Sequence, residues 1–273
     1  MKYNKFSAQP LRAFPIAVLL AIFALTTQSN TVVAGVFNWG DISDPSGDVM
    51  FLNVEEDNSY PTSLFAPLPG DGSPTAVGNS LILDPQTFLS QASDGSHAVD
   101  SELSTIVMVD PSGSIDDILI TEFGDYSLGG LPGSLATAQV GASFFWKILE
   151  IDGSPVNLPQ QTQALEVTTG AGPNGGIYAR PADDGITTPW EGSANIDVDG
   201  FLSDNFLVGN ATKVSLILDN TLLTAADQYS SAVIKKKGVG IEVTGDDIII
   251  VPEPTSLVLL SLCGLAMLGR RRK

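Results

Sequence analysis

Short runs of β-branched and alternating apolar residues, separated by turn sequences, dominate the middle of this 273-residue chain. Asp-Pro-Ser-Gly stands at both 44–47 and 110–113, and a Gly/Pro-rich turn follows at 172–176. Such residues supply turn conformations and end regular elements. No amphipathic stretch of about 12 residues, long enough for a helix of ordinary length, breaks the pattern. We therefore predict an all-β fold, an antiparallel β-sandwich that is jelly-roll-like.

The individual elements follow from the same pattern. Two short helices are expected at 134–139 and at 199–206, and the region around 170–190 is expected to form a long surface loop. The expected strands are 49–54, 80–83, 105–109, 115–121, 143–151, 164–168, 213–218, 239–243 and 247–251.

The first residues have the composition of a secretory signal peptide. Three cations, the last of them Arg12, precede an apolar run at 16–25, and a polar segment follows that ends in small residues. This order is typical of a signal-peptide helix, with cleavage expected between Ala34 and Gly35. The alternative is a retained membrane helix, but the apolar run is well short of the roughly 20 residues that span a bilayer.

The last residues combine three parts in a fixed order. Pro252, Glu253 and Pro254 hold an extended entry, because proline opposes helix and sheet alike. The apolar segment at 255–268 is expected to form a short transmembrane helix. Four terminal cations, which include Arg270, Arg271 and Arg272, are expected to stay cytoplasmic and to leave residues 35–250 outside the inner membrane.

This tail resembles the PEP-CTERM sorting signal of Gram-negative bacteria, through the Pro252-Glu253-Pro254 triplet, the short apolar segment and the arginine cluster. The resemblance implies export, with signal peptidase and an exosortase as partners during maturation and only transient anchoring in the inner membrane. It also implies delivery to the cell surface or to an exopolysaccharide matrix. We therefore divide the chain into a signal peptide (1–34), an acidic β-sandwich ectodomain (35–250) and a sorting signal (251–273).

Charge separates the ectodomain from both ends. The whole chain has 13 Lys and Arg against 31 Asp and Glu, a formal net charge of −18. Residues 35–252 keep six basic residues against 30 acidic ones, a net charge of −24. A surface of this sign excludes strong nucleic-acid binding, which needs basic side chains to replace phosphate counterions. The single cysteine, Cys263, lies in the anchor, so we expect a disulfide-free ectodomain.

Two acidic clusters are candidate calcium sites, since calcium takes six to eight oxygen ligands. The first resembles half of a calcium loop, although Phe206 stands where such loops carry a bidentate glutamate. The second crosses the turn at 44–47. Solvated strand and turn acids are the alternative for both clusters, and no other cofactor is expected. The candidate ligands are Asn195, Asp197 and Asp199 in the first cluster, and Asp41, Asp44 and Asp48 in the second.

Aromatic residues in polar contexts indicate a second kind of site. Trp190 and Tyr178 are candidate carbohydrate platforms, because sugar faces stack on exposed aromatic rings. The run Lys235-Lys236-Lys237 has two interpretations: a dock for an anionic polysaccharide, or a solvated hairpin turn. The sequence predicts no catalytic residues. His97 is the only histidine, and no Gly-x-Ser-x-Gly elbow accompanies it.

These observations predict an exported, non-enzymatic protein of the surface or extracellular matrix, with a structural or adhesive role in exopolysaccharide. The alternatives are a carbohydrate-binding module and, less favoured, an enzyme that acts on glycosides through paired carboxylates.

Overall fold

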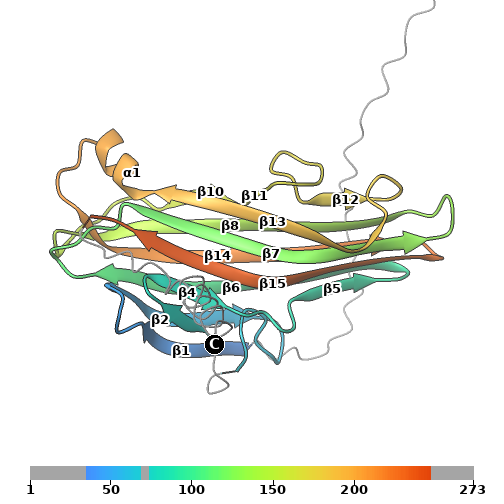
Figure 1. Cartoon of the computed structure of the whole chain (residues 1–273), viewed down its shortest axis with the longest axis horizontal. Coiled ribbons are helices and arrows are strands. Elements are labelled where there is room, and N and C mark those ends of the chain that lie inside the picture. Colours follow the sequence, from blue (N-terminus) through green and yellow to red (C-terminus); the bar gives the residue numbers. More distant parts are fainter. Residues whose placement is uncertain (1–34, 69–73, 247–273) are drawn as a thin grey trace, which may run out of the picture. The chain divides into compact units, whose positions relative to one another are not determined.

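The computed structural model describes residues 35–68 and 74–246, and these form two antiparallel β-sheets. Figure 1 shows their long strands running side by side. Strands that follow one another in the sequence often lie in different sheets, so that β6, β8 and β14 belong to one sheet and β7, β13 and β15 to the other. The fold class predicted from the sequence, all-β with antiparallel strands, is confirmed.

The first sheet has eight strands, six of them in the order β1-β2-β6-β14-β8-β10, while β9 and β12 pair with β8. Their bounds are β1 Gly35–Ser43, β2 Val49–Asn58, β6 Gly95–Val109, β8 Ala136–Ile151, β9 Ser154–Pro155, β10 Gln161–Ala164, β12 Ile177–Ala179 and β14 Ala211–Ala226.

The second sheet has seven strands, six of them in the order β11-β13-β7-β15-β4-β3, while β5 pairs with β15. Their bounds are β3 Thr75–Val77, β4 Ser80–Leu83, β5 Leu89–Ala92, β7 Asp117–Gly130, β11 Glu166–Val167, β13 Gly185–Asp197 and β15 Ser230–Thr244.

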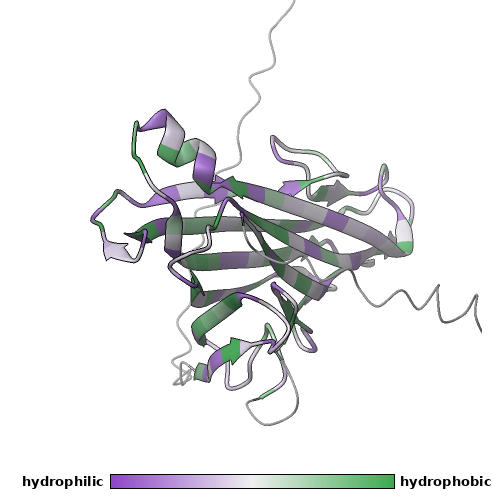
Figure 2. Cartoon of the chain, turned by 60° about the vertical axis from the view of Figure 1, so that its left-hand side comes forward, coloured by the Kyte–Doolittle hydropathy of each residue, from purple (hydrophilic) through white to green (hydrophobic). Residues whose placement is uncertain are grey.

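The core lies between the sheets and is built by alternation along the strands. Residues two apart point to the same face of a strand, so every second side chain of β7 is buried from Ile118 to Leu128. Bands of opposite hydropathy along the long strands follow from this period (Figure 2). The buried aromatic side chains include Phe51, Phe65, Phe88 and Phe144. Burial of this apolar surface is the main driving force for the fold.

The two expected helices have different outcomes. The helix expected at 199–206 is confirmed as α1 (Val198–Asp204), which Asp197 caps by accepting a hydrogen bond from the Gly200 amide at 2.7 Å. The helix expected at 134–139 is wrong, because β8 begins at Ala136. This residue pairs with Ala226, the last residue of the antiparallel strand β14. Ala136, Ala138 and Val140 share the buried face of β8, with Thr137 and Gln139 on the opposite face, and pairing within the sheet overrides the helix propensity of the alanines.

The strand centres were predicted better than the strand lengths. The expectation at 80–83 coincides with β4, whereas the strand expected at 105–109 is only the last part of β6. The long loop expected at 170–190 is wrong as a continuous loop, because β12 interrupts it at Ile177–Ala179 and β13 begins at Gly185. The strand expected at 247–251, the signal peptide and the C-terminal anchor lie outside the described residues. Within the described ranges, no helix is both long and apolar enough to cross a membrane.

Candidate functional site

Three polar side chains meet in the middle of the apolar core. Lys236 points inward from β15, Glu122 from β7 and Asn220 from β14, and each is 0% exposed. The Lys236 ammonium group contacts Glu122 Oε2 and Asn220 Oδ1, so the cluster joins the two sheets. The alternation of each strand places these residues, because Lys236 is in phase with Ile234, and Glu122 with Ile120.

The surroundings of the Lys236–Glu122–Asn220 cluster are apolar. The Phe88 ring centre lies 5.2 Å from Lys236 Nζ, and the Phe65 ring centre lies 5.9 Å away. Burial lowers the pKa of Lys236, although the carboxylate of Glu122 acts in the opposite direction. Two buried atoms of the cluster, Glu122 Oε1 and Asn220 Nδ2, have no hydrogen-bond partner within the described part of the chain. An unpartnered buried polar atom is costly, so the cluster is unusual for a purely structural core.

The lysine run at 235–237 is neither a hairpin turn nor a set of three exposed cations, as the two sequence-based interpretations required. All three lysines belong to β15 and none lies in a hairpin turn. Lys236 is buried in the cluster, and Lys237 pairs with Asp125 of β7. The run therefore does not present three free cations to an anionic polysaccharide.

A second buried polar group lies on β2. The Glu56 carboxylate is fully buried, and it belongs to none of the ion pairs found among the described residues. Its Oε1 accepts hydrogen bonds from Asn58 Nδ2, the Leu64 amide and Ser101 Oγ, at 2.6, 2.8 and 2.7 Å. Its Oε2 accepts from Ser63 Oγ at 2.5 Å and from the Phe65 amide at 3.3 Å. Glu56 thereby fastens the segment that carries Phe65 to the first sheet.

Trp190 and Tyr178 are not exposed platforms, and that expectation is wrong. Trp190 is 2% exposed and Tyr178 is 1% exposed, because both point into the core from strands β13 and β12. The Trp190 ring lies against Gly124, where an added Cβ would be 2.8 Å from the ring atom Cε2. Tyr178 stacks on Tyr126 of the other sheet, with ring centres 3.9 Å apart. Neither ring offers a free face to a sugar.

The stacked tyrosines predict a late alkaline titration. Burial raises the pKa of both Tyr178 and Tyr126 above the ordinary value of 10.0. The fold thus favours the neutral phenols, and this stabilisation is present below pH 10 and is lost as the pH rises through the raised pKa values. Ultraviolet absorbance should show part of the tyrosinate signal appearing at higher pH in the native protein than in the denatured one, and Tyr178→Phe should diminish that late part. Coincident native and denatured curves would contradict this.

Carboxylates in both candidate calcium clusters accept hydrogen bonds from nearby groups of the protein. Asp44 accepts from Ser46 and from the Gly78 amide, which lowers its pKa, and Asp41 accepts from the Asn53 amide at 2.9 Å. Asp44 and Asp48 line one hollow of about 460 Å³.

In the other cluster, Asn195 donates to Asp117 Oδ1 at 2.8 Å, and Asp197 caps α1. Asp199 lies in the first turn of that helix. Across the described residues, no three His, Cys, Asp or Glu side chains are grouped to hold a metal ion. Calcium binding stays a prediction.

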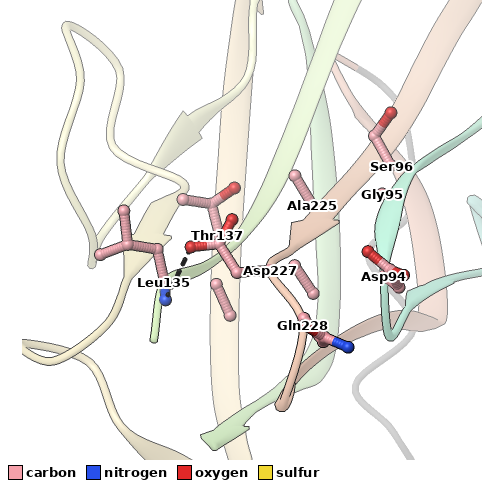
Figure 3. A pocket seen from close by; sticks show the side chains of 10 residues that line it. Asp94, Gly95, Ser96, Leu135, Thr137, Ala225, Asp227 and Gln228 are labelled. Carbon is pink, nitrogen blue, oxygen red and sulfur yellow. Dashed lines mark hydrogen bonds between the residues drawn. The ribbon is translucent and has the colours of Figure 1, made fainter. Parts of the chain in front are cut away.

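A surface hollow of about 440 Å³ lies where β6 and β8 begin and β14 ends (Figure 3). Asp94 and Gln228 are on one side of it and Leu135 is on the other, with the Leu135 amide donating to Asp227 Oδ2 at 3.3 Å. His97 lies nearby on β6, and its Nδ1 is 3.2 Å from Ser90 Oγ. Because Ser90 is fully buried, this contact does not form an accessible nucleophile.

Comparison with protein families identifies the C-terminal segment. Residues 251–273 match the PEP-CTERM protein-sorting motif, with the boundaries expected from the sequence. The chain is therefore a PEP-CTERM protein, and the motif implies an exported protein that an exosortase processes. No named family covers the ectodomain, and no curated protein matches the chain.

Solved structures give only distant likenesses. The family 11 xylanase from Neocallimastix patriciarum is 10% identical, with 78% of this chain and 100% of that chain covered and a TM-score of 0.20. Endoglucanase 3 of family GH12 from Trichoderma harzianum is 8% identical, with 77% and 98% covered and a TM-score of 0.19. The family 12 xyloglucanase from Bacillus licheniformis is 9% identical, with 78% and 100% covered and a TM-score of 0.19. Likenesses at this level carry no inference about this chain.

Proposed function

We propose that this protein is a non-enzymatic component of the cell surface or the exopolysaccharide matrix, with a structural or adhesive role. The sorting motif at residues 251–273 is the observation that carries the proposal. In this proposal the leader is removed after Ala34, and the segment at 255–268 is a transient anchor in the inner membrane. Pro252, Glu253 and Pro254 form the segment that the exosortase recognises.

Features of the described residues support a structural role. Their buried apolar side chains form one core between two long-stranded sheets, and this core includes buried polar clusters that join separate strands. Residues 35–252 contain six basic and 30 acidic residues, so the exported part is strongly anionic. A net charge of this size keeps a secreted protein soluble and favours contact with cations over contact with other polyanions.

Replacing Pro252, Glu253 and Pro254 with alanines should stop processing of the tail. The reason is that alanine restores helix-forming freedom and a backbone N–H at two positions, and removes the one acidic side chain of the segment. Cell fractionation with immunoblotting of the full chain should show the variant retained in the inner membrane, whereas the parent chain is released. A matched control replaces Pro155, Pro159 and Glu166, which lie far from the tail in sequence, and should be released normally. Release of the triple tail variant at the parent level would overturn the proposal.

A further inference from the structure

The Lys236–Glu122–Asn220 cluster has the composition and contacts of an amide-forming centre. An amine, a primary carboxamide and a carboxylate meet in a space closed by the Phe65 and Phe88 rings. The Lys236 Nζ contacts Asn220 Oδ1, which is bonded directly to the carboxamide carbon Cγ. Nitrogen and carbon are therefore held as neighbours, as a reaction between them requires.

We propose that Lys236 and Asn220 are joined by an intramolecular isopeptide bond, formed inside the folded protein with Glu122 as the proton carrier. This bond would link β15 of one sheet to β14 of the other. The proposal concerns the folded ectodomain and is independent of the sorting function.

The reaction balances without any further reagent. Glu122 Oε2 takes a proton from the Lys236 ammonium group, which leaves a neutral amine with a free electron pair. That pair attacks Asn220 Cγ and forms the Nζ–Cγ bond. The carboxylic acid of Glu122 gives its proton to Nδ2, and the Cγ–Nδ2 bond breaks as the carbonyl re-forms. The Glu122 carboxylate then takes the second proton from Nζ and remains protonated. The products are a secondary amide and one ammonia molecule, and nothing is oxidised or reduced.

Each unusual feature of the cluster has a part in this reaction. Burial favours the neutral amine, and a desolvated lysine is a known form of activated nucleophile. Asn220 Nδ2, the nitrogen that leaves, is buried and has no partner to hold it among the described residues. Glu122 Oε1 is likewise unpartnered there, so the carboxyl group keeps one oxygen available for proton transfer. The two phenylalanine rings exclude water, which would otherwise compete for the carboxamide carbon.

Peptide mapping of the purified full chain tests the bond directly. A protease that cuts before aspartate separates Asn220, in peptide 219–226, from Lys236, in peptide 227–245. We expect both peptides to be recovered as one branched species, lighter than their summed masses by one ammonia molecule. An uncut peptide 219–245 with a deamidated Asn220 has the same elemental composition. The deciding readout is therefore two amino termini in the fragment spectrum.

Four variants locate the chemistry. Lys236→Met and Asn220→Ala should each abolish the branched species, and Glu122→Gln should reduce it strongly because an amide does not carry the proton. Lys235→Met, a change of the neighbouring lysine outside the cluster, should leave the branched species at the parent level. Recovery of separate peptides 219–226 and 227–245 from the folded parent protein would overturn the proposal, whether or not the variants fold.

Discussion

Replacing Glu56 with alanine should lower the free energy of unfolding by about 3–5 kcal/mol, because buried donors without an acceptor cost about 1–3 kcal/mol each and the segment relaxes only in part. Five donors lose the carboxylate; Ser63 Oγ keeps the Ala66 carbonyl and Asn58 Nδ2 the Thr62 carbonyl, but the backbone amides of Leu64 and Phe65 lose the acceptor that they have. For a domain of this size such a loss corresponds to a decrease in Tm of about 10 °C. Thermal unfolding followed by circular dichroism measures it.

The neighbouring Glu55 provides the matched control. Its carboxylate accepts one exposed hydrogen bond, from Asn38 Nδ2 at 2.8 Å. Glu55→Ala should therefore change the stability by no more than about 0.5 kcal/mol. Glu56→Gln should fall between the two, since its amide nitrogen can no longer accept from Ser63 or Phe65. If Glu56→Ala and Glu55→Ala had the same Tm, the buried carboxylate of Glu56 would not hold the segment that carries Phe65.

Replacing Trp190 with alanine should destabilise the protein by about 3–5 kcal/mol, the usual cost of removing a large aromatic side chain from a packed core. Trp190→Phe should cost less. The indole Nε1 has no hydrogen-bond partner among the described residues, so phenylalanine loses volume but no hydrogen bond. Reversible denaturation in urea, with the midpoint and slope fitted separately, measures both variants.

Phe123 is the control for Trp190. Both residues line a surface hollow of about 450 Å³, but Phe123 is 52% exposed and Trp190 is buried. Phe123→Ala should leave the stability nearly unchanged. A sugar platform predicts the reverse for Trp190: unchanged stability of Trp190→Ala together with weaker retention on a polysaccharide column. That pair of results would refute the core position of Trp190 and restore the carbohydrate interpretation.

The β-class of the fold could be predicted from the sequence because turns and alternation are local signals. Strand length could not, since β6 and β13 continue through residues that resemble loop. Trp190 shows the reason: Pro189 and Glu191 flank it, yet it is in phase with Ala194 and Ile196 on the buried face of β13. Gly192 stands between them and hides the period.

The Lys236–Glu122–Asn220 cluster could not be predicted from the sequence, for a different reason. Lys and Glu are almost never fully buried unless they are paired, so a run of three lysines suggests a solvated surface. The signal that identifies the exception is phase: Lys236 continues the inward series of Ala232 and Ile234. Phase alone does not reveal a partner. Asn220 and Glu122 lie on other strands, and only the sheet topology brings them to Lys236.

The position of β15 determines how the protein bears mechanical load. It is the last strand of the described residues, and it pairs with β7 on one side over most of its length and with β4 and β5 on the other. Tension on the chain beyond Asp246 therefore enters through an interior strand and acts along its axis. Hydrogen bonds between antiparallel strands are perpendicular to that axis, so they resist together in shear and are not peeled apart one by one. A force applied at the end of β15 is thus shared by the hydrogen bonds on both sides of the strand.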